Sequence, residues 1–180
     1  MNELSFRQYA VSLERETSIT YRRMAEVVTQ PRIREVLIYL AEEEEAHIRD
    51  IEKMTSEAPA DDLLNTALVR AREEHQLVFP DSAGVASLKS EEEILNQALH
   101  LEIQSVEFYK SLHDLLCDSD LKSQIHRLLD MELDHVSNLR NLLRLQQRSE
   151  KDVSLSQEEE EKMLRDAIAV DHARRRSGTE

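Results

Sequence analysis

Four long segments of the sequence carry apolar residues at helical spacing, and a glutamate interrupts the apolar stripe of each one. The segments cover about residues 5–28, 31–54, 90–116 and 121–147, and the interrupting residues are Glu14, Glu44, Glu102 and Glu132. Stripes with this spacing pack against one another in four-helix bundles. The sequence therefore predicts an all-α four-helix bundle whose core contains four carboxyl groups.

The length and composition support a single helical domain. Two glycines and three prolines in 180 residues leave little material for the turns of a β-sandwich or barrel. We expect the bundle to occupy residues 1–148 and a C-terminal tail to occupy residues 149–180, where a short helix can form after Ser156.

Charge and cysteine content restrict the classes of binding partner and the cellular compartment expected for this chain. The net charge of −14 disfavours nucleic acid and anionic membranes as partners. No apolar run reaches the roughly 18 residues that a membrane span needs. The first residues do not resemble an export signal, and the single cysteine, Cys117, fits a reducing compartment. The expected location is therefore the cytoplasm.

The lengths of the connections predict the topology. Short turns near residues 29–32 and 117–120 make the first and second helices antiparallel neighbours, and likewise the third and fourth. The connection over residues 55–89 is far longer than a local turn needs, and residues 61–77 within it have a helical pattern. We expect this long crossover to run the length of the bundle, so that the second and third helices are parallel.

The interrupting glutamates belong to a larger repeat in the sequence. A constant offset of 88 residues joins Glu14 to Glu102, Tyr21 to Tyr109, Glu44 to Glu132 and His47 to His135. A shared offset of this kind indicates an internal duplication of a helical hairpin. It also singles out Glu44 within the run of four glutamates, because only Glu44 has an aligned acid on the stripe of the fourth helix. The rest of the run is predicted to be a solvated face.

Two of the duplicated motifs are Glu-x-x-His. Glutamate and histidine three residues apart lie on one helix face and point at one spot. Unpaired carboxylates in a core would cost several kcal/mol each, whereas a domain is stable by only about 5–15 kcal/mol. Protonation can neutralise some of them, and two divalent ions can neutralise four. Oxygen and imidazole ligands suit iron or manganese. The sequence thus favours a metal site over a metal-free bundle.

Two glutamates and two Glu-x-x-His motifs from four helices form the ligand pattern of ferritin-like di-iron and di-manganese carboxylate proteins. Within that group, residues 5–147 resemble the rubrerythrin-like family. "ALHLEIQSVEFYKSL" and "AVSLERETSITYRRM" resemble signatures on its third and first helices, and "LAEEEEAH" and "LDMELDH" resemble its Glu-x-x-His helices. The resemblance implies a ferritin-like fold and a site for two iron ions, with manganese or zinc as alternatives.

The resemblance also implies a role for each site residue. The bridging carboxylates would be Glu44 and Glu132, the terminal ones Glu14 and Glu102, and the imidazole ligands His47 and His135. Tyr21 and Tyr109 lie two turns after their glutamates, where they can hydrogen-bond ligand carboxylates across the bundle or serve as ordinary core residues.

Two departures from the family pattern bear on activity. Rubrerythrins with a rubredoxin-like domain carry four cysteines, whereas this sequence has one, so a separate electron-donor protein is expected. Ser105 stands where the family has an additional carboxylate three residues after its third-helix glutamate. Ligand exchange attributed to that carboxylate is therefore not implied for this chain.

The expected function is that of a non-haem di-iron protein that reacts with hydrogen peroxide or dioxygen, as a ferroxidase or a peroxide-reducing oxidoreductase. The alternatives are a non-catalytic iron-binding, storage or sensing protein, and a di-manganese or other di-iron oxidoreductase. We expect a homo-oligomer, with a dimer favoured.

Overall fold

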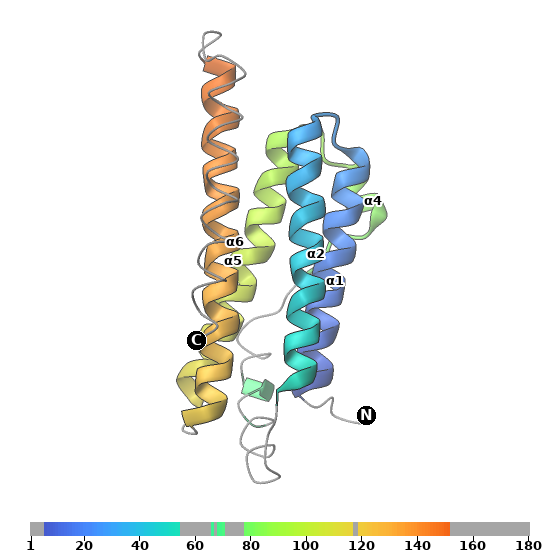
Figure 1. Cartoon of the computed structure of the whole chain (residues 1–180). Helices are drawn as coiled ribbons and strands as arrows, with labels where there is room; N and C mark the ends of the chain where they lie inside the picture. The colour runs from blue at the N-terminus through green and yellow to red at the C-terminus, as the bar shows by residue number, and fades with distance from the viewer. Residues whose placement is uncertain (1–5, 55–65, 67, 71–77, 117–118, 152–180) are drawn as a thin grey trace.

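The protein is a bundle of long α-helices. The computed structural model describes residues 6–54, 66, 68–70, 78–116 and 119–151, and these residues contain no β-strand. The long helices are α1 (Phe6–Val27), α2 (Pro31–Lys53), α5 (Glu91–Leu115) and α6 (Ser119–Lys151), and a short helix, α4 (Ser82–Ala86), precedes α5. The four long helices lie side by side, which confirms the predicted all-α four-helix bundle (Figure 1).

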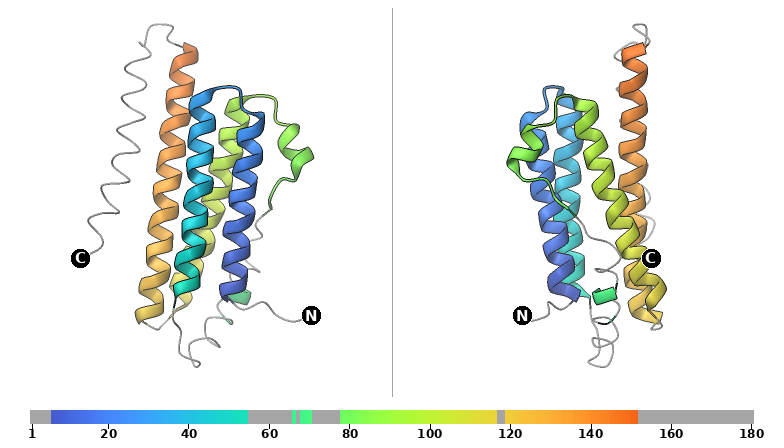
Figure 2. Two further views of the ribbon diagram at one scale, coloured as in Figure 1. Left: turned by 45° about the vertical axis from the view of Figure 1, so that its right-hand side comes forward. Right: turned by 180° about the vertical axis from the view of Figure 1, so that it is seen from behind.

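The helix directions follow the predicted topology. Figure 1 shows that α1 and α2 are antiparallel, as are α5 and α6. Helices α2 and α5 both run from the end with the α1–α2 turn towards the end with the α5–α6 turn, so they are parallel. Across the two hairpins, α1 contacts α5 and α2 contacts α6 (Figure 2). Each long helix therefore has an antiparallel neighbour in the other hairpin as well as in its own.

The crossover between the hairpins is described in part. Residues 66 and 68–70 are helical, and Leu68 is buried. Farther along the chain α4, which the sequence analysis did not predict, packs against α1. It begins at Asp81, whose side chain accepts a hydrogen bond of 2.7 Å from the Gly84 amide. The remainder of the predicted helical segment over residues 61–77 lies outside the described residues.

The N-terminus of α5 joins the two hairpins. Ser90 caps the helix by accepting a hydrogen bond of 3.1 Å from the Glu93 amide. In the same turn, Glu91 Oε1 accepts hydrogen bonds from the Thr29 amide at 3.0 Å, the Thr29 hydroxyl at 2.7 Å and the Gln30 amide at 2.7 Å. This clasp ties the α1–α2 turn to the start of α5.

The end of α6 differs from the prediction. The helix continues to Lys151, beyond the predicted end at residue 147, because no glycine or proline interrupts it after Leu121. The predicted tail helix lies outside the described residues. None of the described helices has the length and apolarity needed to cross a membrane.

The buried apolar residues that the structure describes form two clusters, one towards each end of the bundle. The first, which includes Tyr21, Leu37 and Leu95, lies towards the α1–α2 turn. The second, which includes Tyr109 and Leu128, lies towards the α5–α6 turn. The ionisable residues of the predicted site lie between the two clusters along the helices, where both exclude water.

Candidate metal centre

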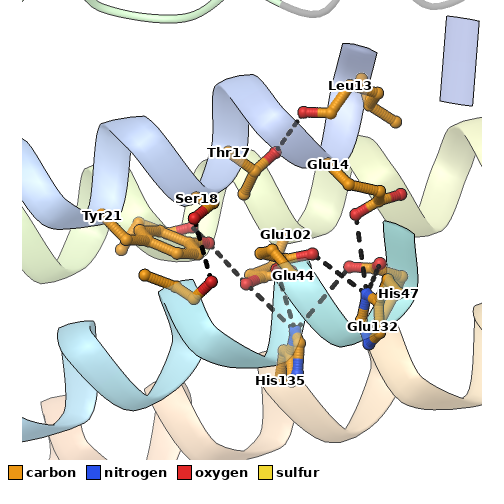
Figure 3. Close-up of polar contacts among 12 residues, drawn as sticks. Leu13, Glu14, Thr17, Ser18, Tyr21, Glu44, His47, Glu102, Glu132 and His135 are labelled. Atoms are coloured by element: carbon orange, nitrogen blue, oxygen red, sulfur yellow. Dashed lines mark hydrogen bonds and ion pairs between the residues drawn. The ribbon is translucent and has the colours of Figure 1, made fainter. Parts of the chain in front are cut away.

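The six predicted ligands meet in the middle of the bundle. Each long helix contributes to the group, and every member is at most 1% exposed: Glu14 from α1, Glu44 and His47 from α2, Glu102 from α5, and Glu132 and His135 from α6. Figure 3 shows these side chains pointing towards one another. These residues meet because each lies on the apolar stripe of its helix, and that stripe faces the inside of the bundle.

Two of the glutamates face both histidines. Glu44 places Oε2 3.0 Å from Nδ1 of His47 and Oε1 3.3 Å from Nδ1 of His135. Glu132 places Oε1 3.3 Å from Nδ1 of His47 and Oε2 4.0 Å from Nδ1 of His135. The imidazole rings are stacked, with centroids 5.1 Å apart. Each of these carboxylates thus presents one oxygen to each half of the site, as a bridging ligand must.

The other two glutamates each face one histidine. Glu14 Oε2 lies 3.6 Å from His47 Nδ1, and Glu102 Oε1 lies 3.4 Å from His135 Nδ1. The ligand atoms consequently form two groups of four, with all atoms in a group within 4.8 Å of one another. Both groups contain Glu44 and Glu132; Glu14 and His47 complete the first, and Glu102 and His135 complete the second.

Two tyrosines connect the hairpins at the terminal carboxylates. The Tyr21 hydroxyl of α1 donates a hydrogen bond of 2.5 Å to Oε1 of Glu102 on α5. The Tyr109 hydroxyl of α5 donates a short hydrogen bond to Oε1 of Glu14 on α1. Burial and the neighbouring carboxylates, Glu102 beside Tyr21 and Glu14 beside Tyr109, raise the pKa of both tyrosines well above 10. Both phenols therefore stay protonated and act as donors.

The charges of the cluster shift its pKa values in different directions. Burial and repulsion by Glu44 raise the pKa of Glu14 to about 8, and the same two causes raise the pKa of Glu132 well above its usual range. Burial alone would raise the pKa of Glu44, but His47 and His135 outweigh it and lower the pKa. Burial would lower the pKa of both histidines, but the carboxylates raise it well above 6.5. Without metal, the cluster therefore holds protons.

The chemistry of the donor atoms fits metal ions. Nine buried side-chain atoms in the cluster have no hydrogen-bond partner: both oxygens of Glu44 and Glu132, both ring nitrogens of His47 and His135, and one oxygen of Glu102. Buried polar atoms nearly always form hydrogen bonds, so this number of atoms that form none, several of them approaching one another only as ion pairs, needs an explanation. Two divalent cations bound by oxygen and imidazole would supply the missing partners and replace the protons.

The other glutamates of the acidic run lie outside this cluster. Glu42 is exposed, as expected for a solvated face, whereas Glu43 and Glu45 are half-buried. Glu45 forms an ion pair of 2.7 Å with Arg22 of α1. Of the four adjacent glutamates, Glu44 is thus the one whose side chain lies in the cluster.

Two polar contacts beside the site were not predicted from the sequence. Ser18 donates a hydrogen bond of 3.0 Å to the Ala41 carbonyl, and this bond holds α1 against α2. The Tyr21 hydroxyl also lies 3.4 Å from the Ala98 carbonyl. These contacts use backbone acceptors, which leave no mark in the side-chain pattern of a sequence. Ser105 is buried at 2% exposure on α5, one turn after Glu102.

Fold and site together define the class: a ferritin-like four-helix bundle with a buried cluster of carboxylates and imidazoles that can hold metal ions. A scan of protein-family models matches residues 6–143 with the family described as Rubrerythrin. The chain belongs to the rubrerythrin family. Searches of curated proteins and of solved structures found no match.

Proposed function

We propose that this protein is a non-haem di-iron oxidoreductase that reacts with hydrogen peroxide or dioxygen, in a ferroxidase or peroxide-reducing reaction. The observation that carries the proposal is the pair of four-residue groups sharing Glu44 and Glu132, whose members include nine buried oxygen and nitrogen atoms without a hydrogen-bond partner. Membership of the rubrerythrin family supports iron as the metal.

Each residue of the cluster has a role in this proposal. Glu14 and His47 would hold one ion, Glu102 and His135 would hold the other, and Glu44 and Glu132 would bind both. When bound, a pair of iron ions supplies the redox equivalents for reducing an O–O bond. The four negative charges of the carboxylates would balance the four positive charges of two divalent ions, so the buried site as a whole would carry no net charge from these groups.

The surrounding residues would orient the ligands and exclude water. Tyr21 and Tyr109 fix the carboxylates of Glu102 and Glu14 through hydrogen bonds from the opposite hairpin. The apolar clusters at both ends of the site keep bulk water out, which strengthens electrostatic interactions within it.

The partners follow from the same chemistry. The single cysteine of this sequence cannot form a four-thiolate iron site, so we assign electron delivery to a separate donor protein. A cytoplasmic location is consistent with this low cysteine content. We further propose a homo-oligomer, most simply a dimer, to be checked by light scattering.

The test begins with stoichiometry and proceeds to turnover. Protein loaded anaerobically with ferrous ion should contain two irons per chain by elemental analysis, and manganese loading run in parallel would reveal a di-manganese preference. Addition of peroxide or dioxygen should then oxidise both irons, followed by optical absorption in a stopped-flow instrument. One iron or none per chain would contradict the proposal. Two irons that do not react would instead indicate a storage or sensing protein.

A further inference from the structure

A cavity lies between the C-terminal part of α2 and the N-terminal half of α6. Its volume is about 200 Å³, and its lining includes Asp50 and Lys53 of α2 and Arg127, Leu128 and Met131 of α6. Asp50 and Lys53 form an ion pair of 3.2 Å, with 48% and 75% of their side chains exposed. The cavity therefore has a charged, solvent-facing rim and apolar walls.

The inner wall of the cavity adjoins the ligands. Leu128 is 1% exposed and lies one helical turn before Glu132 on the same face of α6. Side chains in helices lean towards the N-terminus, so the side chain of Glu132 lies over the turn that holds Leu128. Asp50 lies one turn after His47 on α2. On both helices, therefore, a residue that lines the cavity is one turn away from a residue of the cluster.

The cavity lies on one side of the pair of ion positions. Along α6, the lining residues precede Glu132, and His135 lies one turn farther from the cavity. Along α2, the lining residues follow His47. Leu128 belongs to the same apolar cluster as Leu13, the neighbour of Glu14. The cavity is therefore nearer to the position completed by Glu14 and His47 than to the one completed by Glu102 and His135.

The 88-residue repeat identifies the equivalent place at the other end of the site. Gln124, Arg127 and Leu128 correspond to Val36, Tyr39 and Leu40, and Met54 corresponds to Leu142. Four of the seven counterparts are packed: Val36, Leu40 and Leu142 are buried in the apolar cluster around Tyr21, and Tyr39 packs against it. The other three, Glu43, Asn138 and Asn141, are half-buried or exposed. Polar Gln124 and Arg127 at the cavity are thus replaced by an apolar and an aromatic side chain at the counterpart.

We propose that the α2–α6 cavity is the entrance through which metal ions and small oxidants reach the centre, and that it serves the Glu14–His47 position first. The two positions have the same ligand types, but their surroundings differ: Leu128 lines the cavity on the side of one, and Val36, Leu40 and Leu142 are packed in the core on the side of the other. This inference rests on the proposed function, because it requires that two ions bind.

Metal exchange measures access directly, without enzymatic turnover. Protein loaded with two Co²⁺ ions should release them to excess EDTA in two phases of equal amplitude, followed by cobalt absorption. The fast phase should be missing in Glu14→Ala, and the slow phase in Glu102→Ala, which assigns each phase to one position. Failure to bind two ions would overturn the proposed function together with this inference. Two bound ions released at one common rate would overturn this inference alone.

Two matched truncations test the wall of the cavity. Leu128→Ala should join the cavity to the site and speed the fast phase by about tenfold. Leu40→Ala is the matched control: it removes the same atoms at the equivalent position, one turn before Glu44, and the Leu40 side chain is 0% exposed. This variant should leave the fast phase unchanged. Equal acceleration in both variants would mean that exchange occurs by general loosening of the core, and would refute the entrance.

A third variant closes the cavity without touching the core. Arg127→Tyr introduces the residue found at the counterpart, Tyr39, and should slow the fast phase by about tenfold. Arg127→Gln removes the same charge without adding an aromatic ring, and should leave the fast phase within about twofold of the parent rate. If Arg127→Gln slows release as much as Arg127→Tyr, charge controls the rate and the steric entrance is refuted.

Discussion

The hydrogen bonds between tyrosines and terminal carboxylates provide a specific test of the site. Changing Tyr109 to phenylalanine removes the hydroxyl that donates to Glu14, and changing Tyr21 to phenylalanine removes the one that donates to Glu102. Both aromatic rings are 0% exposed, and phenylalanine keeps the ring in place within the core. We expect each substitution to weaken one of the two ion positions and to spare the other.

The size of the effect follows from the type of bond. A hydrogen bond to a charged group contributes about 1.5–3 kcal/mol, and each 1.4 kcal/mol changes an equilibrium constant tenfold. Loss of a hydrogen bond that orients a metal ligand typically weakens metal affinity by about 10- to 100-fold. Each variant should therefore lose about 10- to 100-fold in affinity for one Co²⁺ ion, and the double variant should lose it for both.

The assay is a titration of metal-free protein with Co²⁺ in the presence of a competing chelator. Tyr9→Phe is the matched control, because Tyr9 lies on α1 with its ring against Phe108 and is not part of the cluster. A double-mutant cycle assigns the pairs: Tyr109→Phe should have little further effect in Glu14→Ala and its full effect in Glu102→Ala. Unchanged affinities in both single variants, together with lower stability, would show that the tyrosines only fill the core.

Three further predictions follow from other contacts. Glu44→Ala should abolish binding of at least one ion, whereas Glu42→Ala, in the exposed part of the same run, should leave two ions per chain by elemental analysis. Glu91→Gln should lower the free energy of unfolding at pH 7 by about 1 kcal/mol, measured with urea, because it weakens the clasp on Thr29 and Gln30. Burial would raise the pKa of Glu91, but hydrogen bonds from Thr29 and Gln30 outweigh it and lower the pKa below 4.5. The contribution of Glu91 to stability is therefore present above pH 4.5 and disappears as the pH falls through the folded-state pKa. A difference in stability between parent and variant that persists at pH 2 would contradict this prediction. Co²⁺ at 100 times its dissociation constant should stabilise the protein by about 2.7 kcal/mol for each bound ion. Each ion should raise the melting temperature, measured by circular dichroism, by about 5–11 °C.

The sequence predicted the bundle because helix formation and burial follow the same stripes of residues. The four glutamates and two histidines violate the apolar pattern, and such violations are where functional residues are expected. The 88-residue offset then selected Glu44 from four adjacent glutamates, a choice that composition alone could not make. Parallel α2 and α5 followed from the length of their connection.

Other features depend on three-dimensional packing and were not predicted. Helix α4 is short, and its only local signal is Asp81 three residues before Gly84. The clasp by Glu91 joins residues 61 or 62 positions apart, and the sequence contains no periodicity that connects them. The cavity is lined by residues from two helices, and the sequence does not show that residues such as Asp50 and Arg127 lie close together until those helices are placed.

The duplication also explains why neither hairpin can form the centre alone. The Glu14–His47 position takes three residues from the α1–α2 hairpin and one, Glu132, from the other hairpin. The second position takes three residues from α5 and α6 and one, Glu44, from α2. The tyrosine at each position again comes from the opposite hairpin. Ion binding at this cluster would therefore join the two halves of the bundle, and the free energy of metal binding would contribute directly to their docking.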